Sequence, residues 1–163
     1  MVFETERLMV RPFEPRDLED FMVYRNNLEW MKYQGFKGLG RQDYETALLS
    51  EGSLETGLQL AIILKLADQL MGDLYLKRTG QDAWAGCTID PRYARAGLAY
   101  EAMEGLCSKL TSEQVNYLYA SVMPENEASI GLLKKLQFQF VQWDDLGDEV
   151  YRLELTKAKL DPL

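Results

Sequence analysis

The 163-residue chain contains no histidine and only two cysteines, and each scarcity excludes a class of site. Without an imidazole there is no Ser-His-Asp or Cys-His nucleophilic centre, because both need histidine as their base. Cys87 and Cys107 do not have the spacing of metal ligands, so we expect no metal site. One lies in an apolar strand pattern and the other in a helical one, which predicts two buried thiols rather than a disulfide.

Positive charge is also scarce, since 18 Lys and Arg stand against 26 Asp and Glu, a net charge of −8. A nucleic-acid partner needs a basic surface, so we expect none. No apolar run approaches the length of a membrane span, because Gln59 and Lys65 interrupt the longest one. The first residues carry acids and no apolar signal core, which indicates a cytoplasmic protein without a membrane partner.

The pattern of apolar residues predicts a single domain over residues 1–163. The expected strands span residues 7–11, 58–65, 69–77, 83–89, 117–122, 138–143 and 149–155. The expected helices span residues 14–27, 43–50, 98–110 and 127–136. Consecutive strands joined by short turns favour antiparallel pairing. We therefore expect an α/β (α+β) fold, with a mixed, mostly antiparallel sheet of six to seven strands flanked by about four helices.

Two segments carry more information than the rest. Residues 89–103 run from a β-branched strand through Pro91 and small residues into a helix. Such a turn leaves backbone N–H groups unpaired beside the positive end of the helix dipole. This arrangement suits an anion such as a phosphate. One strand later, residues 122–138 begin another helix at Pro124-Glu125-Asn126, where Asn126 suits the N-cap position. Taken alone, either segment is an ordinary structural connection.

Together with Thr5-Glu6-Arg7-Leu8-Met9-Val10-Arg11-Pro12, these segments resemble the GNAT superfamily of acyl-CoA-dependent N-acetyltransferases. The resemblance extends in order from Thr5 to about Tyr151. It is nearest to the branch of Rim-like ribosomal-protein N-terminal acetyltransferases, which share a similar opening and a Pro-Glu-Asn-x-x-Ser helix start. It implies acetyl-CoA as cofactor, held where two central strands splay apart.

The resemblance also implies which residues bind coenzyme A. They are the strand residues Cys87, Thr88 and Ile89, the turn residues Ala94, Arg95, Ala96, Gly97, Leu98 and Ala99, and the helix residues Asn126 and Ser129. Gly97 and Ala99 match the family's phosphate-binding pattern, whereas Ala94 replaces its usual Gln or Arg and Arg95 stands where glycine is frequent. Arg95 either clamps a phosphate, points to solvent or marks weakened cofactor binding, and these alternatives stay open.

For acetyl transfer by direct attack of an amine, the resemblance implies Ser129 as the acid that protonates the departing thiolate, although Ser129 also fits a plain helix position. The glutamate that usually acts as the general base in the family is replaced here by Trp84. Its possible substitutes are Glu101, Asp73, Asp82 and Glu29, or a relay of water. Glu101 is our candidate, although an acid also suits a helix N-terminus for structural reasons.

The acceptor is left open between a protein N-terminal α-amine and a small-molecule amine, and the assembly between a monomer and a homodimer. Aromatic residues that belong either to the acceptor groove or to the core are Trp84, Tyr75, Trp30, Tyr33 and Phe36. A different class of function is a catalytically reduced acyl-CoA-binding or partner-docking module. Departures at Ala94, Arg95, Trp84 and Gln137 favour that module, whereas Gly97, Asn126 and Ser129 argue against it.

Overall fold

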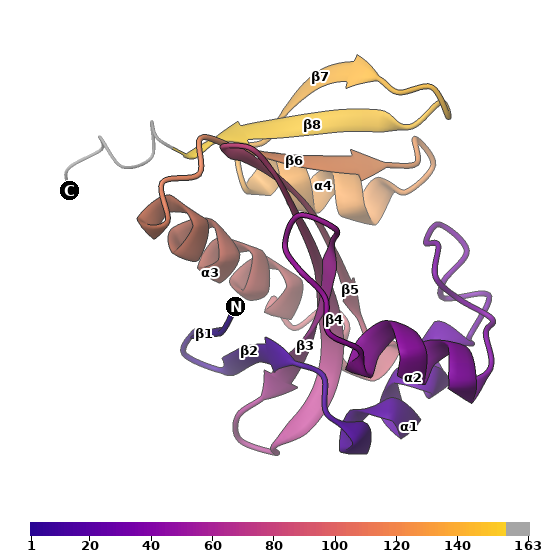
Figure 1. Ribbon diagram of the computed structural model, residues 1–163. Coiled ribbons are helices and arrows are strands. Elements are labelled where there is room, and N and C mark those ends of the chain that lie inside the picture. Colours follow the sequence, from indigo (N-terminus) through magenta and orange to yellow (C-terminus); the bar gives the residue numbers. More distant parts are fainter. Residues whose placement is uncertain (156–163) are drawn as a thin grey trace.

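Every strand of the computed structural model, which describes residues 1–155, joins one twisted sheet (Figure 1). The strands are β1 (Phe3–Glu4), β2 (Leu8–Pro12), β3 (Leu58–Leu64), β4 (Gln69–Thr79), β5 (Asp82–Ile89), β6 (Tyr117–Val122), β7 (Gln139–Trp143) and β8 (Glu149–Glu154). The helices are α1 (Leu18–Arg25), α2 (Arg41–Leu49), α3 (Leu98–Ser112) and α4 (Glu127–Lys135). Spatially the strands follow the order β1-β2-β3-β4-β5-β6-β8-β7.

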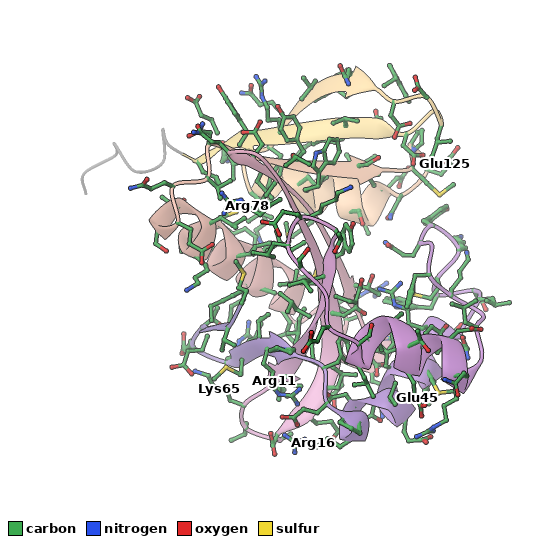
Figure 2. All side chains as sticks on the ribbon, in the orientation of Figure 1. Arg11, Arg16, Glu45, Lys65, Arg78 and Glu125 are labelled. Carbon is green, nitrogen blue, oxygen red and sulfur yellow. The ribbon has the colours of Figure 1, made fainter. Side chains whose placement is uncertain are left out.

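Helices cover both faces of this sheet, and the alternation of side chains along β3 shows why. Leu60 and Ile62 point to the face where α3 and α4 pack, whereas Ala61 and Ile63 point to the face of α1 and α2. Strands buried on both sides need continuous apolar runs, and β3 has one. Charged side chains such as Arg16, Glu45 and Lys65 project from the outside of the molecule (Figure 2).

One junction in the sheet differs from all others in the described part of the chain. β5 and β6 are parallel, and only Ala83 with Leu118 and Trp84 with Tyr119 are paired before the strands separate. On its other side β5 pairs antiparallel with β4 over its whole length, from Asp82 to Ile89. Figure 1 shows β5 and β6 starting together and then diverging. The splayed strands implied by the sequence are therefore present.

The strand count and the first helix differ from the sequence-based expectation. The sheet has eight strands rather than six to seven, because Phe3–Glu4 pairs with Val10 and Met9 as a two-residue edge strand. A strand this short has no periodicity to detect. The helix expected over 14–27 is a 3-10 turn at Pro15–Asp17 followed by α1.

The end of α4 has a cap of the kind that glycine usually forms, although Gln137 occupies it. Gln137 has φ +73°, in the left-handed region. The N–H of Phe138 donates to the Leu133 carbonyl at 2.9 Å and the N–H of Gln137 to that of Lys134 at 3.0 Å, which is the usual glycine-type helix cap. The cap is thus kept, and its conformational strain falls on Gln137.

Candidate active site

The separation of β5 from β6 opens a cleft of about 250 Å³. Its lining includes Tyr33, Cys87, Asn126, Ser129 and Asp148. They come from the α1–α2 connection, β5, the start of α4 and the β7–β8 turn. Four segments far apart in sequence therefore meet where the sheet is interrupted. Three of the sequence-predicted site residues, Cys87, Asn126 and Ser129, lie in this one cleft.

The edge of β5 that faces the cleft has open backbone groups. The carbonyl of Thr88 points toward β4, since a Cβ placed on Gly72 would lie 2.3 Å from it. Because successive carbonyls of a strand alternate in direction, those of Cys87 and Ile89 point to the opposite side. The Ile89 carbonyl accepts a hydrogen bond from the Trp30 indole at 2.9 Å. Cys87 therefore presents its backbone N–H and carbonyl to the cleft. Burial raises the pKa of the Cys87 thiol, which stays protonated.

Thr88, in contrast, has a structural role. Its hydroxyl accepts a hydrogen bond from buried Arg25 at 3.3 Å. Arg25 also binds the Asp73 carboxylate at 2.6 Å and the Gly35 carbonyl at 3.1 Å. Because Gly35 itself lines the cleft, this network fixes the α1–α2 connection as one of its walls. Asp73, one of the possible bases, is only 1% exposed and serves as the centre of this network.

The turn that precedes α3 has the shape of an anion cradle. Arg95 at φ +63° and Gly97 at φ +76° both adopt left-handed backbone conformations. Gly97 is the N-cap of α3 and supplies no side-chain cap, so the first N–H groups of the helix stay open. Before the turn, the Asp90 carboxylate accepts the Arg92 N–H at 2.9 Å and fixes the 3-10 turn Pro91–Tyr93. The turn thus leaves backbone donors open at the start of α3, and its binding of a phosphate stays a prediction.

Asn126 and Ser129 are joined at the first turn of α4. The Asn126 side chain accepts the backbone N–H of Ser129 at 3.2 Å, as the predicted N-cap requires. Asn126 is buried, and this contact ties the loop that ends β6 to the helix. Both residues line the cleft, with Ser129 one helical turn above the cap.

Asp148 is a cleft residue that our sequence reasoning missed. Its backbone N–H donates to the Asp144 side chain at 2.9 Å, which fixes the β7–β8 turn. Partial burial, with the nearby carboxylates of Asp144 and Glu125, raises the pKa of Asp148 above its ordinary value. Glu125 lies in the connection between β6 and α4 (Figure 2). The pairing of Val122 with Glu149 explains why Asp148 lies in the cleft, because it brings the β7–β8 turn to the end of β6.

Glu101, our candidate base, lies outside the cleft. It belongs to a separate groove between the N-terminal segment and α3. Its carboxylate accepts hydrogen bonds from the hydroxyl of Thr5 at 2.5 Å, the backbone N–H of Arg7 at 2.9 Å and the Arg7 side chain at 2.7 Å. Partial burial raises the pKa of Glu101, but these bonds outweigh it and lower the pKa below its ordinary value. This placement does not support Glu101 as the base.

The aromatic candidates divide between cleft and scaffold. Tyr33 lines the cleft, and Trp30 reaches the Ile89 carbonyl beside it. Trp84 instead stacks on Tyr119 at a ring distance of 5.0 Å, across the short β5–β6 pairing. Phe36 packs with Phe21 and Tyr44 in the core under α1 and α2.

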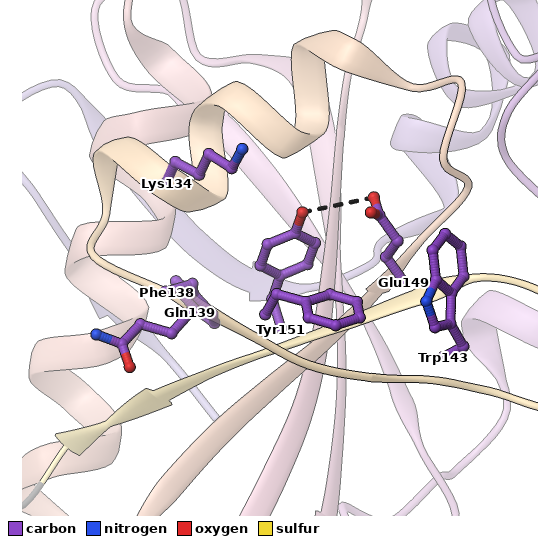
Figure 3. Close-up of a pocket in the computed structure, with 7 residues that line it drawn as sticks. Lys134, Phe138, Gln139, Trp143, Glu149 and Tyr151 are labelled. Carbon is purple, nitrogen blue, oxygen red and sulfur yellow. Dashed lines mark hydrogen bonds between the residues drawn. The ribbon is translucent and has the colours of Figure 1, made fainter.

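A second hollow lies over β7 and β8 and shares no lining residue with the cleft. Figure 3 shows it, with Lys134 of α4 above and Tyr151 donating to Glu149 at 3.4 Å. Phe140 and Trp143 form its apolar side. None of the sequence-predicted site residues lies there.

Within residues 1–155 no group of three acidic or cysteine side chains is placed to hold a metal ion. No helix there is long and apolar enough to cross a membrane.

Comparisons with known proteins agree on one family. A family model described as acetyltransferase (GNAT) domain matches residues 7–139. The chain is 30% identical over 143 residues to the uncharacterised N-acetyltransferase p20 of Bacillus licheniformis, covering 83% of this chain and 80% of that protein.

Solved structures give a similar result for the fold. A GNAT-family acetyltransferase from Bacillus anthracis superposes with a TM-score of 0.83 at 21% identity, over 95% of this chain and 99% of that one. RimL, described as a ribosomal L7/L12 alpha-N-protein acetyltransferase in complex with coenzyme A, superposes with a TM-score of 0.80 at 11% identity, over 94% of this chain and 98% of that one. At these identities the likeness concerns the fold alone.

Proposed function

This chain belongs to the GNAT family of acetyltransferases, and on that premise we propose that residues 1–163 form one enzyme domain that transfers the acetyl group of acetyl-CoA to a primary amine. The observation that carries the proposal is the cleft between β5 and β6. It places an open strand edge at Cys87, a hydroxyl at Ser129 and a carboxylate at Asp148 around one space.

The residues present fit two parts of coenzyme A, the diphosphate and the pantetheine arm. The turn Arg95–Gly97 and the open first N–H groups of α3 suit the diphosphate. The cleft-facing backbone of Cys87 suits the amides of the pantetheine arm, which need one donor and one acceptor. Acetyl-CoA supplies the activated acetyl group as a thioester.

The acceptor amine enters as an ammonium ion, and Asp148 is the carboxylate that the cleft offers it. A carboxylate whose pKa is raised by burial and by Asp144 and Glu125 accepts a proton more readily than an exposed one. Asp148 therefore binds the cation first and then takes its proton. The negative net charge of the protein adds a favourable field for a cationic acceptor.

The two side chains then divide the proton transfers of a direct attack. Asp148 takes one proton from the ammonium, and the free amine forms the C–N bond to the acetyl carbon. As the C–S bond breaks, the Ser129 hydroxyl donates its proton to the leaving thiolate. Ser129 regains a proton from the nitrogen of the new amide, and Asp148 releases its own to water. The products are an N-acetylated amine, the free thiol and one proton.

A protein N-terminal α-amine is the acceptor class we propose first. The similarity in fold to RimL, named for α-N-protein acetylation, supports it. A small-molecule amine is the other acceptor class. The cleft wall at Gly35, whose carbonyl accepts a hydrogen bond from Arg25, is where we propose that the size of the acceptor is distinguished.

The test measures free thiol released from acetyl-CoA with a panel of N-terminal peptides and small amines. We expect release with at least one acceptor, and we expect Asp148→Asn to lower kcat/KM about 100-fold with unchanged affinity for acetyl-CoA. Asp145→Asn, an exposed neighbour in the same turn, is the matched control and should leave both unchanged.

Two results would contradict the proposal. Full activity of Asp148→Asn would remove Asp148 from the chemistry. Stabilisation of the protein by acetyl-CoA without thiol release from any amine would favour an acyl-CoA-binding module instead.

A further inference from the structure

The N-terminal segment is tied to the first turn of α3 by one carboxylate. Glu101 accepts three hydrogen bonds, one from Thr5 and two from Arg7, from residues more than 90 positions earlier in the sequence. A loose surface ion pair would use one bond. Two of the three bonds hold the Thr5–Arg7 segment through the Thr5 hydroxyl and the Arg7 backbone N–H, and the third, from Nε, orients the guanidinium of Arg7.

That guanidinium reaches further, to the turn before the helix. Its Nη1 donates to the carbonyl of Ala96 at 3.1 Å, and its Nη2 lies 3.7 Å from the position a Cβ would take on Gly97. In a planar trans peptide the C=O and the N–H point in opposite directions. When Arg7 holds the Ala96 carbonyl, the N–H of Gly97 on the same peptide must therefore point away from Arg7.

Arg7 also removes an electrostatic conflict. Glu101 places a negative charge in the first turn of α3, beside the turn where a diphosphate would carry further negative charge. The ion pair at 2.7 Å compensates the Glu101 carboxylate and leaves the positive end of the helix for the ligand.

We propose that Arg7 is a positioning residue for coenzyme A, which orients the Ala96–Gly97 peptide so that the Gly97 N–H faces the diphosphate. This inference rests on the proposed function, since it assumes that coenzyme A binds at this turn. It assigns a role to the Thr5–Arg7 segment and a second role to Glu101, as the anchor of Arg7 rather than as a base.

The position of Arg7 makes the role separable from folding. Its side chain is 46% exposed, and exposed ion pairs contribute little to stability. Arg7→Lys keeps the charge, but an ammonium cannot copy the fork that bridges Glu101 and Ala96. Arg7→Gln removes the charge as well.

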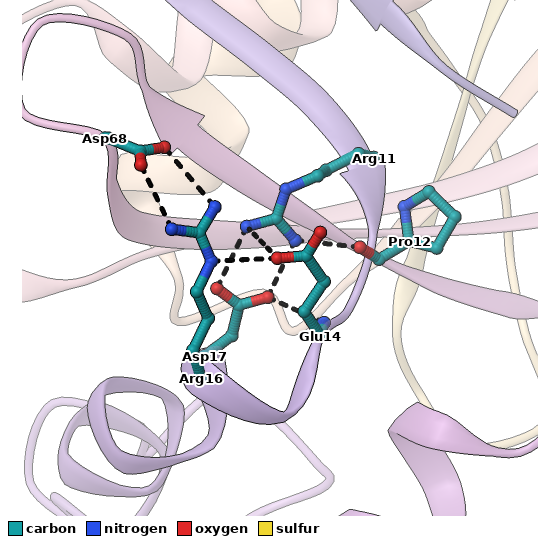
Figure 4. Close-up of polar contacts among 6 residues, drawn as sticks. All are labelled: Arg11, Pro12, Glu14, Arg16, Asp17 and Asp68. Atoms are coloured by element: carbon teal, nitrogen blue, oxygen red, sulfur yellow. Dashed lines mark hydrogen bonds and ion pairs between the residues drawn. The ribbon is translucent and has the colours of Figure 1, made fainter.

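Arg16 is the matched control. It is 55% exposed and bridges two acceptors, Glu14 at 2.8 Å and Asp68 at 3.0 Å, as Figure 4 shows. It joins the start of the 3-10 turn Pro15–Asp17 to the β3–β4 turn, and its hydrogen bonds reach none of residues 94–99. Arg16→Gln therefore reports the loss of a comparable surface arginine.

The experiment measures the Kd of coenzyme A by calorimetry, and kcat/KM with acetyl-CoA and with S-acetylpantetheine, which lacks the diphosphate. We expect both Arg7 variants to bind coenzyme A about tenfold more weakly, with kcat at saturation unchanged. We expect kcat/KM with S-acetylpantetheine to be unchanged, since Gly97 has no diphosphate to meet. Arg16→Gln should match the wild type in every measurement.

Three results would overturn the inference. One is wild-type affinity for coenzyme A in both Arg7 variants. Another is an equal loss with both acetyl donors, which would indicate a general structural defect. The third is a failure of the wild-type protein to bind coenzyme A, which would remove the proposed function as well, whereas the first two leave it standing.

Discussion

Replacing Arg95 by glycine should change stability and cofactor affinity in opposite directions. Arg95 has φ +63°, a conformation that costs a residue with a Cβ about 1–2 kcal/mol. Glycine avoids this cost but loses about 0.5–1 kcal/mol through the greater freedom of its unfolded chain. The net gain in the free energy of unfolding is about 0–1.5 kcal/mol, a rise of up to about 6 °C in Tm for a domain of this size.

The affinity for acetyl-CoA should fall at the same time. The exposed guanidinium of Arg95 stands on the same turn as Gly97, where it can meet a phosphate oxygen. A hydrogen bond between charged groups contributes about 1.5–3 kcal/mol, so its loss corresponds to a Kd at least about tenfold higher. Strain retained at a ligand site is expected where the strained side chain has a function.

Thermal unfolding without ligand measures the first effect, and calorimetric titration with coenzyme A measures the second. Arg95→Ala separates them, because alanine keeps the strain and lacks the charge, so only affinity should fall. A stability gain without loss of affinity in Arg95→Gly would show that the side chain only points to solvent. A lower Tm in Arg95→Gly would refute the strain argument itself.

Three further substitutions test other parts of the structure. Ser129→Ala should lower kcat about tenfold to 100-fold while the Kd of acetyl-CoA stays within about twofold, in steady-state kinetics and calorimetry; equal losses in both would make Ser129 a binding residue. Arg25→Met should lower the free energy of unfolding by about 3–5 kcal/mol in urea titrations, because it leaves the Asp73 carboxylate buried and unpaired; a loss below about 1 kcal/mol would contradict this. Gln137→Gly should raise the free energy of unfolding by about 0.5–1 kcal/mol by relieving a left-handed residue, and a decrease would show that the Gln137 side chain has a stabilising contact.

Features encoded by neighbouring residues were predicted well from the sequence. Asn126 caps α4 as expected, because an N-cap signal involves residues only three positions apart. The turn at Gly97 also follows from local chemistry, since its φ of +76° lies in the left-handed region, which glycine adopts without the steric cost of a Cβ.

Features that depend on distant residues were not predicted. The interactions of Glu101 come from Thr5 and Arg7, and nothing near Glu101 in the sequence indicates them. Asp148 enters the cleft only because β8 pairs with β6 and brings its preceding turn alongside. In the sequence, Asp148 is one of several acids in a polar turn, which is the ordinary composition of a solvent-exposed hairpin.

The brief pairing between β5 and β6 also has a mechanical consequence. Two residue pairs join β1–β5 to β6–β8, whereas β4 and β5 are joined along the full length of β5. Bending the sheet at this junction breaks few backbone hydrogen bonds, whereas bending it between β4 and β5 would break a whole ladder. Within the body of the sheet, over residues 1–155, the β5–β6 junction is therefore where backbone hydrogen bonds least oppose bending, and it lies beside the stacked rings of Trp84 and Tyr119 and the cleft.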